Sequence, residues 1–360
     1  MSYSFTDLGT LGGAGWGTIS TAAAINNFGQ IVGQSITSEG WYHATLWDGA
    51  TTTDLGQSRG YSNAYAINNA GIIAGVDSFS SGYIYGQHAT LWNVTAATDL
   101  GTLGGTNSIA FAINNVGQVA GFAEVYYNGY MLGHVWNGAA PVSVTFISTP
   151  SSISDINDAG QVVGSSRGSQ YAGYHSEQAT LWDGTTETNL GTLGGTYSIA
   201  FAINNAGLVV GMADTADFYV AEHATLWNGI TTTDLGTLGQ PSSTGGYSSP
   251  AGSAAYAINN SGIVVGYSTI GAATHATLWN DTTITDLNSF LDASTVSAGW
   301  VLNRANGISD NGLIVGNASN NLLGITSHAF LLTPAAVPVP PAIWLFGSGL
   351  GLLAFYRKKG

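Results

Sequence analysis

The chain has 360 residues, no cysteine, 44% apolar residues and 51 glycines, and only 7% of its residues are charged. This composition supplies ample material for a folded core, and the lack of cysteine excludes a disulfide scaffold and any thiolate metal site. Residues 1–341 hold all 20 carboxylates and three arginines, a formal net charge of −17, which argues against binding to nucleic acid or to an anionic membrane surface.

An Ile-Asn-Asn-x-Gly segment recurs along the chain and defines a repeat. Its five regular copies and two looser ones are spaced by 42, 46, 43, 47, 55 and 50 residues. The copies are Ile25-Asn26-Asn27, Ile67-Asn68-Asn69, Ile113-Asn114-Asn115, Ile156-Asn157-Asp158, Ile203-Asn204-Asn205, Ile258-Asn259-Asn260 and Ile308-Ser309-Asp310. Seven repeats therefore account for nearly the whole chain before residue 334.

Each repeat predicts four short strands in chain order. The first precedes the Asn pair, where Asn and Gly are expected to form a tight turn because both tolerate positive φ. The second follows the turn, as at 207–211, and a loop of variable length comes next. The third is a His-Ala-Thr-Leu-Trp segment, as at 223–227, and an Asx-Gly hairpin signal joins it to a Thr-rich fourth strand ending in Asp-Leu-Gly.

Four antiparallel strands in about 45 residues match one blade of a β-propeller. The two ends of the chain complement each other. The last repeat stops after the strand at 328–332, without an Asp-Leu-Gly strand, whereas Phe5–Gly9 supplies one at the start. The sequence therefore predicts an all-β, seven-bladed propeller over residues 1–333, in which the N-terminal strand completes the last blade and leaves no open strand edge.

The connections sort into two faces. Turns between first and second strands and between third and fourth strands are short and uniform, whereas the other loops vary, so the variable face is the candidate binding face. Exposed aromatic rings among carboxylates and amides suit glycan binding, but they equally suit a protein interface or packing within the loops themselves. The candidate ligand-binding residues are Trp41, Tyr42, Tyr83, Tyr85, Tyr126, Tyr127, Tyr171, Tyr174, Phe218 and Tyr219.

The recurrent histidines, tryptophans and aspartates are interpreted as structural. A side chain repeated around a ring cannot gather at one point unless it lines the axis, and the third strand is not innermost. We therefore expect the histidines to form hydrogen bonds between strands or to a loop, with Gln178 replacing histidine in the fourth blade. The tryptophans should form blade-to-blade core and the Asp of Asp-Leu-Gly should cap a turn. No catalytic residue, metal or cofactor is predicted.

The C-terminal tail has a different composition from the body. Residues 334–341 form a Pro-rich linker, and 342–356 are uncharged and too short, at about 22 Å as a helix, to span a roughly 30 Å hydrocarbon core. The segment resembles the PEP-CTERM sorting signals of Gram-negative bacteria, with Val339 where those signals usually have Glu. The residues that carry this resemblance are Val337, Pro338, Val339, Pro340, Pro341, Arg357, Lys358 and Lys359. It implies a C-terminal helix at 342–360, transient membrane anchoring, and processing by an exosortase.

The body resembles the HAF family of bacterial extracellular repeats, through segments such as His328-Ala329-Phe330. That resemblance implies export and a repeat fold, and it supplies no activity to transfer. We therefore expect an exported cell-surface or extracellular-matrix propeller that binds glycan or protein without catalysis. The alternative is a carbohydrate-active enzyme on the same ring, a glycosidase or lyase, which should gather two or three carboxylates and a base in one pocket near the axis.

Overall fold

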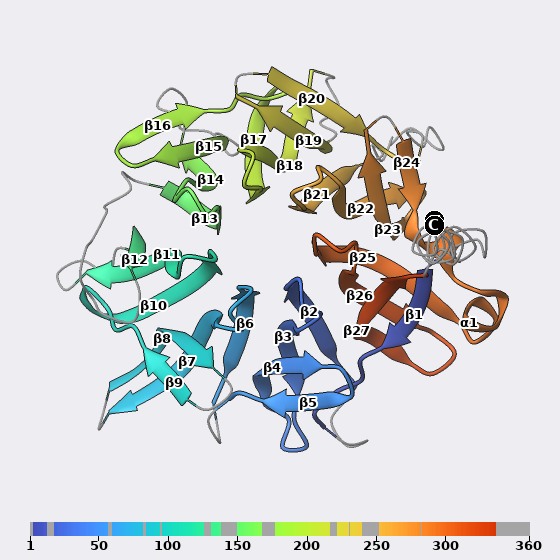
Figure 1. Cartoon of the computed structure of the whole chain (residues 1–360), viewed down its shortest axis with the longest axis horizontal. Coiled ribbons are helices and arrows are strands. Elements are labelled where there is room, and N and C mark those ends of the chain that lie inside the picture. The colour runs from blue at the N-terminus through green and yellow to red at the C-terminus, as the bar shows by residue number, and fades with distance from the viewer. Residues whose placement is uncertain are drawn as a thin grey trace, which may run out of the picture.

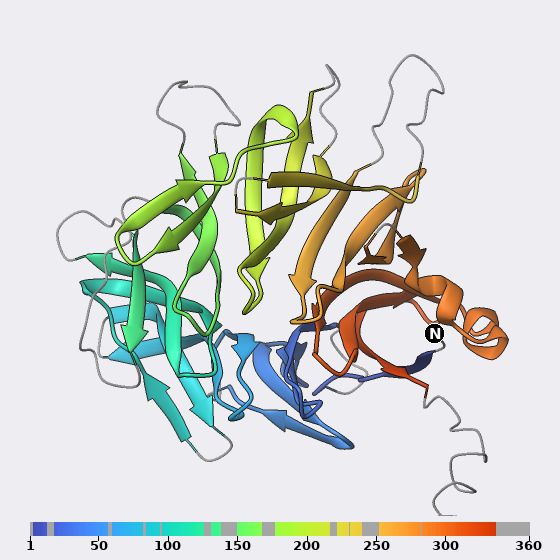
Figure 2. The same ribbon diagram turned by 45° about the horizontal axis from the view of Figure 1, so that its top comes forward.

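Seven small antiparallel sheets surround one axis in the computed structural model, which confirms the predicted seven-bladed propeller (Figure 1). A view turned by 45° about the horizontal axis shows the same ring obliquely (Figure 2). The structure describes residues 3–12, 18–56, 60–81, 84–93, 96–125, 131–137, 150–167, 177–216, 222–229, 231–239, 252–281 and 283–335.

The blades follow the chain in order and are numbered from one to seven, and the innermost strand of each is given first. Blades one to four comprise β2 (Ser20–Ile25), β3 (Ile31–Ile36), β4 (Tyr42–Asp48) and β5 (Thr51–Asp54); β6 (Ser62–Ile67), β7 (Ile73–Ser81), β8 (Ile84–Asn93) and β9 (Ala96–Asp99); β10 (Gly104–Ile113), β11 (Gln118–Val125) and β12 (Met131–Asn137); and β13 (Pro150–Ile156), β14 (Val162–Arg167), β15 (Glu177–Asp183) and β16 (Thr186–Asn189).

The remaining three blades each have four strands. They comprise β17 (Gly194–Ile203), β18 (Leu208–Thr215), β19 (Glu222–Asn228) and β20 (Thr231–Gly236); β21 (Ser253–Ile258), β22 (Val264–Ile270), β23 (Ala273–Asn280) and β24 (Thr283–Asp286); and β25 (Trp300–Ile308), β26 (Ile314–Asn320), β27 (Ile325–Pro334) and β1 (Tyr3–Asp7). Two short helices, η1 (Leu287–Phe290) and α1 (Ala293–Ser297), precede β25.

The N-terminal strand closes the ring, as the sequence predicts. β1 pairs antiparallel with β27, from Tyr3 opposite Pro334 to Asp7 opposite Phe330, so the first and last residues of the ring lie side by side (Figure 1). The ring centroid of Phe5 lies 5.3 Å from that of Trp300. The last blade therefore acquires its outer strand and an apolar anchor from the opposite end of the sequence.

A bulge in each innermost strand requires a glycine in the second strand. In blade five the pairing of β17 with β18 shifts register between Ala200 and Ala202. A Cβ added to Gly211 would lie 1.9 Å from the carbonyl oxygen of Ile199, a distance no side chain tolerates. Equivalent clashes of 1.9–2.1 Å occur at the matching glycines of the other six blades. The repeated glycine of the second strand therefore permits the bulge.

The turns confirm the predicted loop pattern, with one correction. Gly207 of the Asn-Asn-x-Gly turn has a φ of +78°, and Gly229 of the third–fourth turn has a φ of +60°. The tight turns form as predicted, but the asparagines do not use the positive φ that they tolerate, since Asp281 is the sole non-glycine residue with positive φ in the described ranges. Instead, Asn204 shapes the turn through its side chain, whose Oδ1 accepts hydrogen bonds from the amides of Ala206 and Leu208.

The tryptophans fill the spaces between blades, as predicted. Trp92 of the second blade packs with Val32 and Leu46 of the first, and Trp47 packs with Val315 and Ala329 of the seventh. The six motif tryptophans are 0–3% exposed: Trp47, Trp92, Trp136, Trp182, Trp227 and Trp279. They are therefore core residues that join neighbouring sheets, and none offers its face to a ligand.

No helix among the described residues combines the length and apolar composition that a bilayer crossing requires. The predicted C-terminal helix and every residue of the sorting motif lie outside the described residues.

Candidate functional site

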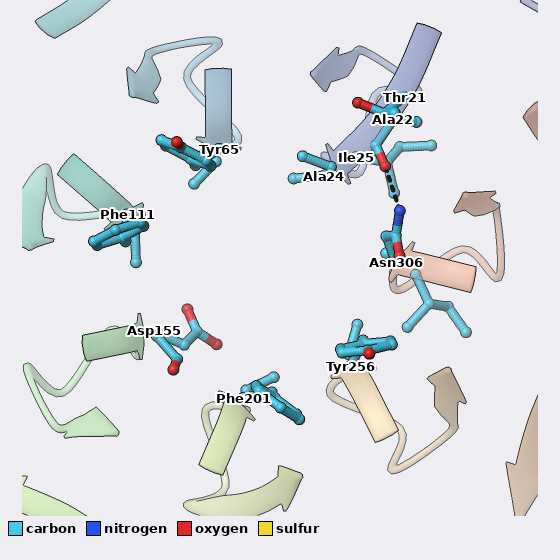
Figure 3. A pocket seen from close by; sticks show the side chains of 18 of the residues that line it. Thr21, Ala22, Ala24, Ile25, Tyr65, Phe111, Asp155, Phe201, Tyr256 and Asn306 are labelled. Atoms are coloured by element: carbon cyan, nitrogen blue, oxygen red, sulfur yellow. Dashed lines mark hydrogen bonds between the residues drawn. The ribbon is translucent and has the colours of Figure 1, made fainter. Parts of the chain in front are cut away.

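The bulged residues of the innermost strands surround a cavity on the propeller axis. They occupy the same repeat position, three residues before the first Asn of the turn, yet they differ from blade to blade. In order they are Ala23, Tyr65, Phe111, Ser154, Phe201, Tyr256 and Asn306. The cavity has a volume of about 480 Å³, within the range of small-ligand sites. It is the candidate functional site (Figure 3).

Four aromatic rings form two walls of this axial cavity. The ring centroids of Tyr65 and Phe111, on blades two and three, lie 5.1 Å apart, and those of Phe201 and Tyr256, on blades five and six, also lie 5.1 Å apart. Figure 3 shows the pairs on either side of Asp155, with the smaller or polar residues of blades seven and one across from it. The carboxylate of Asp155 therefore lies between two pairs of aromatic rings.

Asp155 sets blade four apart from the others. At its repeat position the other blades have alanine or glycine: Ala24, Ala66, Ala112, Ala202, Ala257 and Gly307. Its Oδ1 accepts a hydrogen bond from the amide of Ile156 at 2.8 Å, and its Oδ2 accepts one from Ile203 at 2.9 Å. Burial raises the pKa of this carboxyl to about 6, although both backbone hydrogen bonds favour its charged form.

A positive charge and a polar edge lie on blade seven. The guanidinium carbon of Arg304 lies 4.8 Å from the ring centroid of Tyr256 and 5.4 Å from that of Tyr267. Asn306 donates from Nδ2 to the carbonyl of Ala22 and to Oδ1 of Asn317, both at 2.7 Å. Arg304 and Asp155 are the charged residues among those that line the cavity, and they belong to different sides of the ring.

Two belts of asparagine hydrogen bonds encircle the end of the channel below this cavity. In the inner belt the first Asn of each turn donates from Nδ2 to the backbone carbonyl of the next turn, in six bonds of 2.9–3.3 Å. In the outer belt the second residue of each turn donates from its amide to a side-chain oxygen of the next, and its seven bonds of 2.8–3.0 Å close the circle. The belts hold the blades in fixed positions around the axis.

Five of the six described histidines bind aspartates between strands, as predicted, and none of the six lines the cavity. In five blades the histidine Nδ1 of the third strand lies 2.7–2.9 Å from an Asp oxygen of the fourth. In blade seven that Asp is Asp7 of β1, and in blade four Gln178 and Asn189 replace the pair. The same aspartates cap the following turn, for example Asp54 by accepting from the amide of Gly56.

The loop residues predicted to bind ligand are only partly described. Trp41 is 46% exposed in the turn before β4, Tyr42 is half-buried at the start of β4, and Tyr85 lies in β8. None of these three lines the axial cavity. The others, which lie outside the described residues, are Tyr83, Tyr126, Tyr127, Tyr171, Tyr174, Phe218 and Tyr219.

The sequence contained a signal for the axial cavity that the repeat analysis missed. In five of the seven repeats the segment Ala-x-Ala-Ile-Asn-Asn is constant except at x, which is alanine at Ala23 and aromatic at positions such as Tyr65 and Phe201. A variable position inside an invariant segment indicates a side chain with a role other than packing. The bulge that turns x toward the axis was not apparent from residue alternation alone.

Metal binding has no support in the part of the chain that the structure describes, where no group of three or more His, Asp and Glu side chains is placed to hold an ion.

Blades of antiparallel strands around an axial cavity define the molecule as a β-propeller. It is similar to the β-propeller domain of the Trilobed protease from Pyrococcus furiosus (TM-score 0.55, 9% identity, 92% of this chain and 93% of that chain), for which an open velcro topology is described. It is also similar to a puromycin-hydrolyzing peptidase from Mycobacterium tuberculosis (TM-score 0.50, 9% identity, 90% of this chain and 51% of that chain). At such identities the likeness concerns the fold alone. No protein-family model and no curated protein matches the sequence.

Proposed function

We propose that this propeller is an exported, non-enzymatic module that binds a glycan in its axial cavity. The observation that carries the proposal is the pairing of aromatic walls with polar groups in one cavity of about 480 Å³. Aromatic rings stack on the apolar faces of sugars, and amides and hydroxyls bind sugar hydroxyl groups. Ser154, Asn306 and Thr21 supply such polar groups around the rings.

Binding without turnover is favoured by the number of carboxylates. Glycoside hydrolysis normally requires a pair of carboxyl groups that flank the scissile bond. Among the described residues that line the cavity, Asp155 is the single carboxylate. Of the six described histidines, which could serve as bases, five are bound to aspartates and His134 packs against Trp136; none of the six lines the cavity. The site therefore fits recognition better than the enzymatic alternative.

The first test measures oligosaccharide binding to the full chain and to a variant with one wall removed. Phe201→Ala should lower the affinity about tenfold or more, because it deletes a ring that stacks on the ligand. Alanine is compatible with this position, since Ala23 occupies it in the first blade. An array of neutral, amino and acidic oligosaccharides identifies ligands, and calorimetry then measures affinity.

Trp41→Ala is the matched control, because Trp41 is an exposed aromatic residue outside the cavity, and it should leave the affinity unchanged. The proposal fails if no oligosaccharide binds, or if Trp41→Ala weakens binding while Phe201→Ala does not. Release of new reducing ends from a bound polysaccharide would instead establish the enzymatic alternative.

Export and C-terminal processing form a separate part of the proposal, supported by the two sequence resemblances. We expect the protein secreted by its native host to end near the Pro-rich segment 337–341, without the basic cluster at 357–359. Mass spectrometry of the C-terminal peptide measures this directly. A secreted protein that retains Arg357, Lys358 and Lys359 would contradict the sorting assignment.

A further inference from the structure

We propose that the glycan bound in the axial cavity carries a free amine, as a de-N-acetylated amino sugar does, and that Asp155 binds this cationic group. The inference rests on the proposed function and names its ligand class. Its starting point is a single asymmetry in an otherwise repeated layer. Six blades place alanine or glycine at this position and blade four places a carboxylate there.

The geometry presents the carboxylate to a ligand. Two backbone amides, those of Ile156 and Ile203, hold its oxygens at 2.8 and 2.9 Å, one amide for each oxygen. Each carboxylate oxygen can accept two hydrogen bonds, so each retains an acceptor position. In Figure 3 the side chain of Asp155 points into the cavity. An ammonium group with three donors would complete the hydrogen bonding of this carboxylate.

The rings beside Asp155 also favour a cation. Phe111 and Phe201 belong to the blades on either side of blade four and line the same cavity. A cation close to aromatic faces is attracted by the negative potential of the rings. Arg304 already stacks on Tyr256 near blade seven, which shows this attraction within the protein. The ligand's amine is therefore directed to the Asp155 side, away from the guanidinium.

The charge of the whole body acts in the same direction. Residues 1–341 carry a formal net charge of −17, which attracts cationic polymers and repels acidic polysaccharides at low ionic strength. A polymer of amino sugars combines apolar ring faces for the aromatic walls with positive charge for this field. A uronic-acid polymer shares the ring faces and has the wrong sign of charge.

The inference predicts a dependence on pH. Burial raises the pKa of Asp155 to about 6, and a bound ammonium would lower it again because it favours the ionised form. Protonation of Asp155 competes with the ligand, so affinity falls as the pH drops below about 6, and it falls again at high pH, where the sugar amine loses the proton that gives it its positive charge. The other charged or titratable groups that line the cavity with Asp155 are Arg304, Tyr65 and Tyr256. Burial raises the pKa of both tyrosines to about 12, so they stay neutral. Asp158 lies among the asparagine turns at the end of the channel.

The experiment compares β-linked glucosamine trimers with N-acetylated trimers of the same length, by calorimetry on the full chain at pH 6.8 and pH 5. At pH 6.8 the amine form should bind on the order of tenfold more tightly, and this preference should shrink at pH 5. Asp155→Ala should abolish the preference and leave binding of the N-acetylated trimer unchanged. Alanine occupies this position in five other blades, and the unchanged neutral ligand reports that the variant is folded.

The outcomes separate the two proposals. If the N-acetylated trimer binds as tightly as the amine form, or if Asp155→Ala keeps the preference, the inference is overturned while glycan binding stands. If neither trimer nor any other oligosaccharide binds, the proposed function itself is overturned. An Arg304→Ala variant that retains the preference would support Asp155 as the amine-binding group, and loss of the preference in that variant would contradict it.

Discussion

Deletion of residues 3–7 should lower the free energy of unfolding by about 4 kcal/mol or more and promote aggregation. The deleted strand is the outer strand of blade seven, held through the register from Tyr3–Pro334 to Asp7–Phe330. Its loss removes the burial of Phe5, worth about 2 kcal/mol, and several strand hydrogen bonds of about 1 kcal/mol each. It also leaves β27 as an open edge that can pair with another molecule.

Chemical denaturation monitored by tryptophan fluorescence measures the change, and light scattering measures aggregation. Phe5→Ala should reproduce about half of the loss, since the ring of Phe5 lies against Trp300 and Phe330. Ser4→Ala, at an exposed hydroxyl of the same strand, should change the unfolding free energy by less than about 0.5 kcal/mol. If the deleted protein unfolds at the same denaturant concentration as the full chain, β1 does not close the ring in solution.

The closure could be predicted from sequence because the same strand motifs recur from blade to blade, so a strand missing from one blade can be recognised elsewhere in the chain. The chain begins with an Asp-Leu-Gly strand that has no His strand before it, and it ends with a His strand that has no Asp-Leu-Gly strand after it. These two strands can complete one blade only by pairing with each other. The structure confirms this at atomic level, because Asp7 binds His328 at 2.9 Å, as Asp54 binds His43 within blade one. Each packing rule recurs in several blades, so the tryptophan core and the positions of the turns were predictable as well.

The axial cavity could not be located in the same way. Strict alternation along the first strand assigns Tyr65 and Phe201 to a face, but a bulge shifts the register at each of these residues. The glycine that makes room for the bulge is visible in the sequence, whereas its partner, a carbonyl oxygen of the neighbouring strand, is not. For this reason the sequence points to the variable loops, which contain many aromatic residues, as the binding face.

The asparagine pair shows a second limit of local reasoning. Asn and Gly in a tight turn suggest left-handed backbone conformations, yet Gly alone adopts one in the described Asn-Asn-x-Gly turns. The asparagines instead contact the next blade, 42 to 55 residues along the chain. An interaction of that kind leaves no trace in a single repeat. It follows from the ring, because corresponding turns of neighbouring blades meet at the axis.

Asn204→Ala should lower the free energy of unfolding by about 3 kcal/mol, the second large effect expected in this molecule. The side chain is 4% exposed. Its Nδ2 donates to the carbonyl of Asn259 at 3.1 Å, and its Oδ1 accepts from the amides of Ala206 and Leu208 at 3.0 Å. Alanine would remove all three hydrogen bonds, each of which contributes about 1 kcal/mol, while the carbonyl of Asn259 keeps its bond from the amide of Gly262. Thermal and chemical denaturation of the folded variant measure the loss.

Asn204→Ser is the control, because blade seven has serine at the equivalent position. Ser309 occupies the equivalent position, where its Oγ accepts from the amide of Leu313 at 3.1 Å. Serine at position 204 should therefore restore one of the two acceptor contacts and reduce the loss to about 2 kcal/mol. If alanine and serine are equally harmless, the inner belt does not stabilise the ring, and the Trp-filled interfaces alone hold neighbouring blades together. If both are as harmful as deletion of β1, the belt is required for assembly of the whole ring.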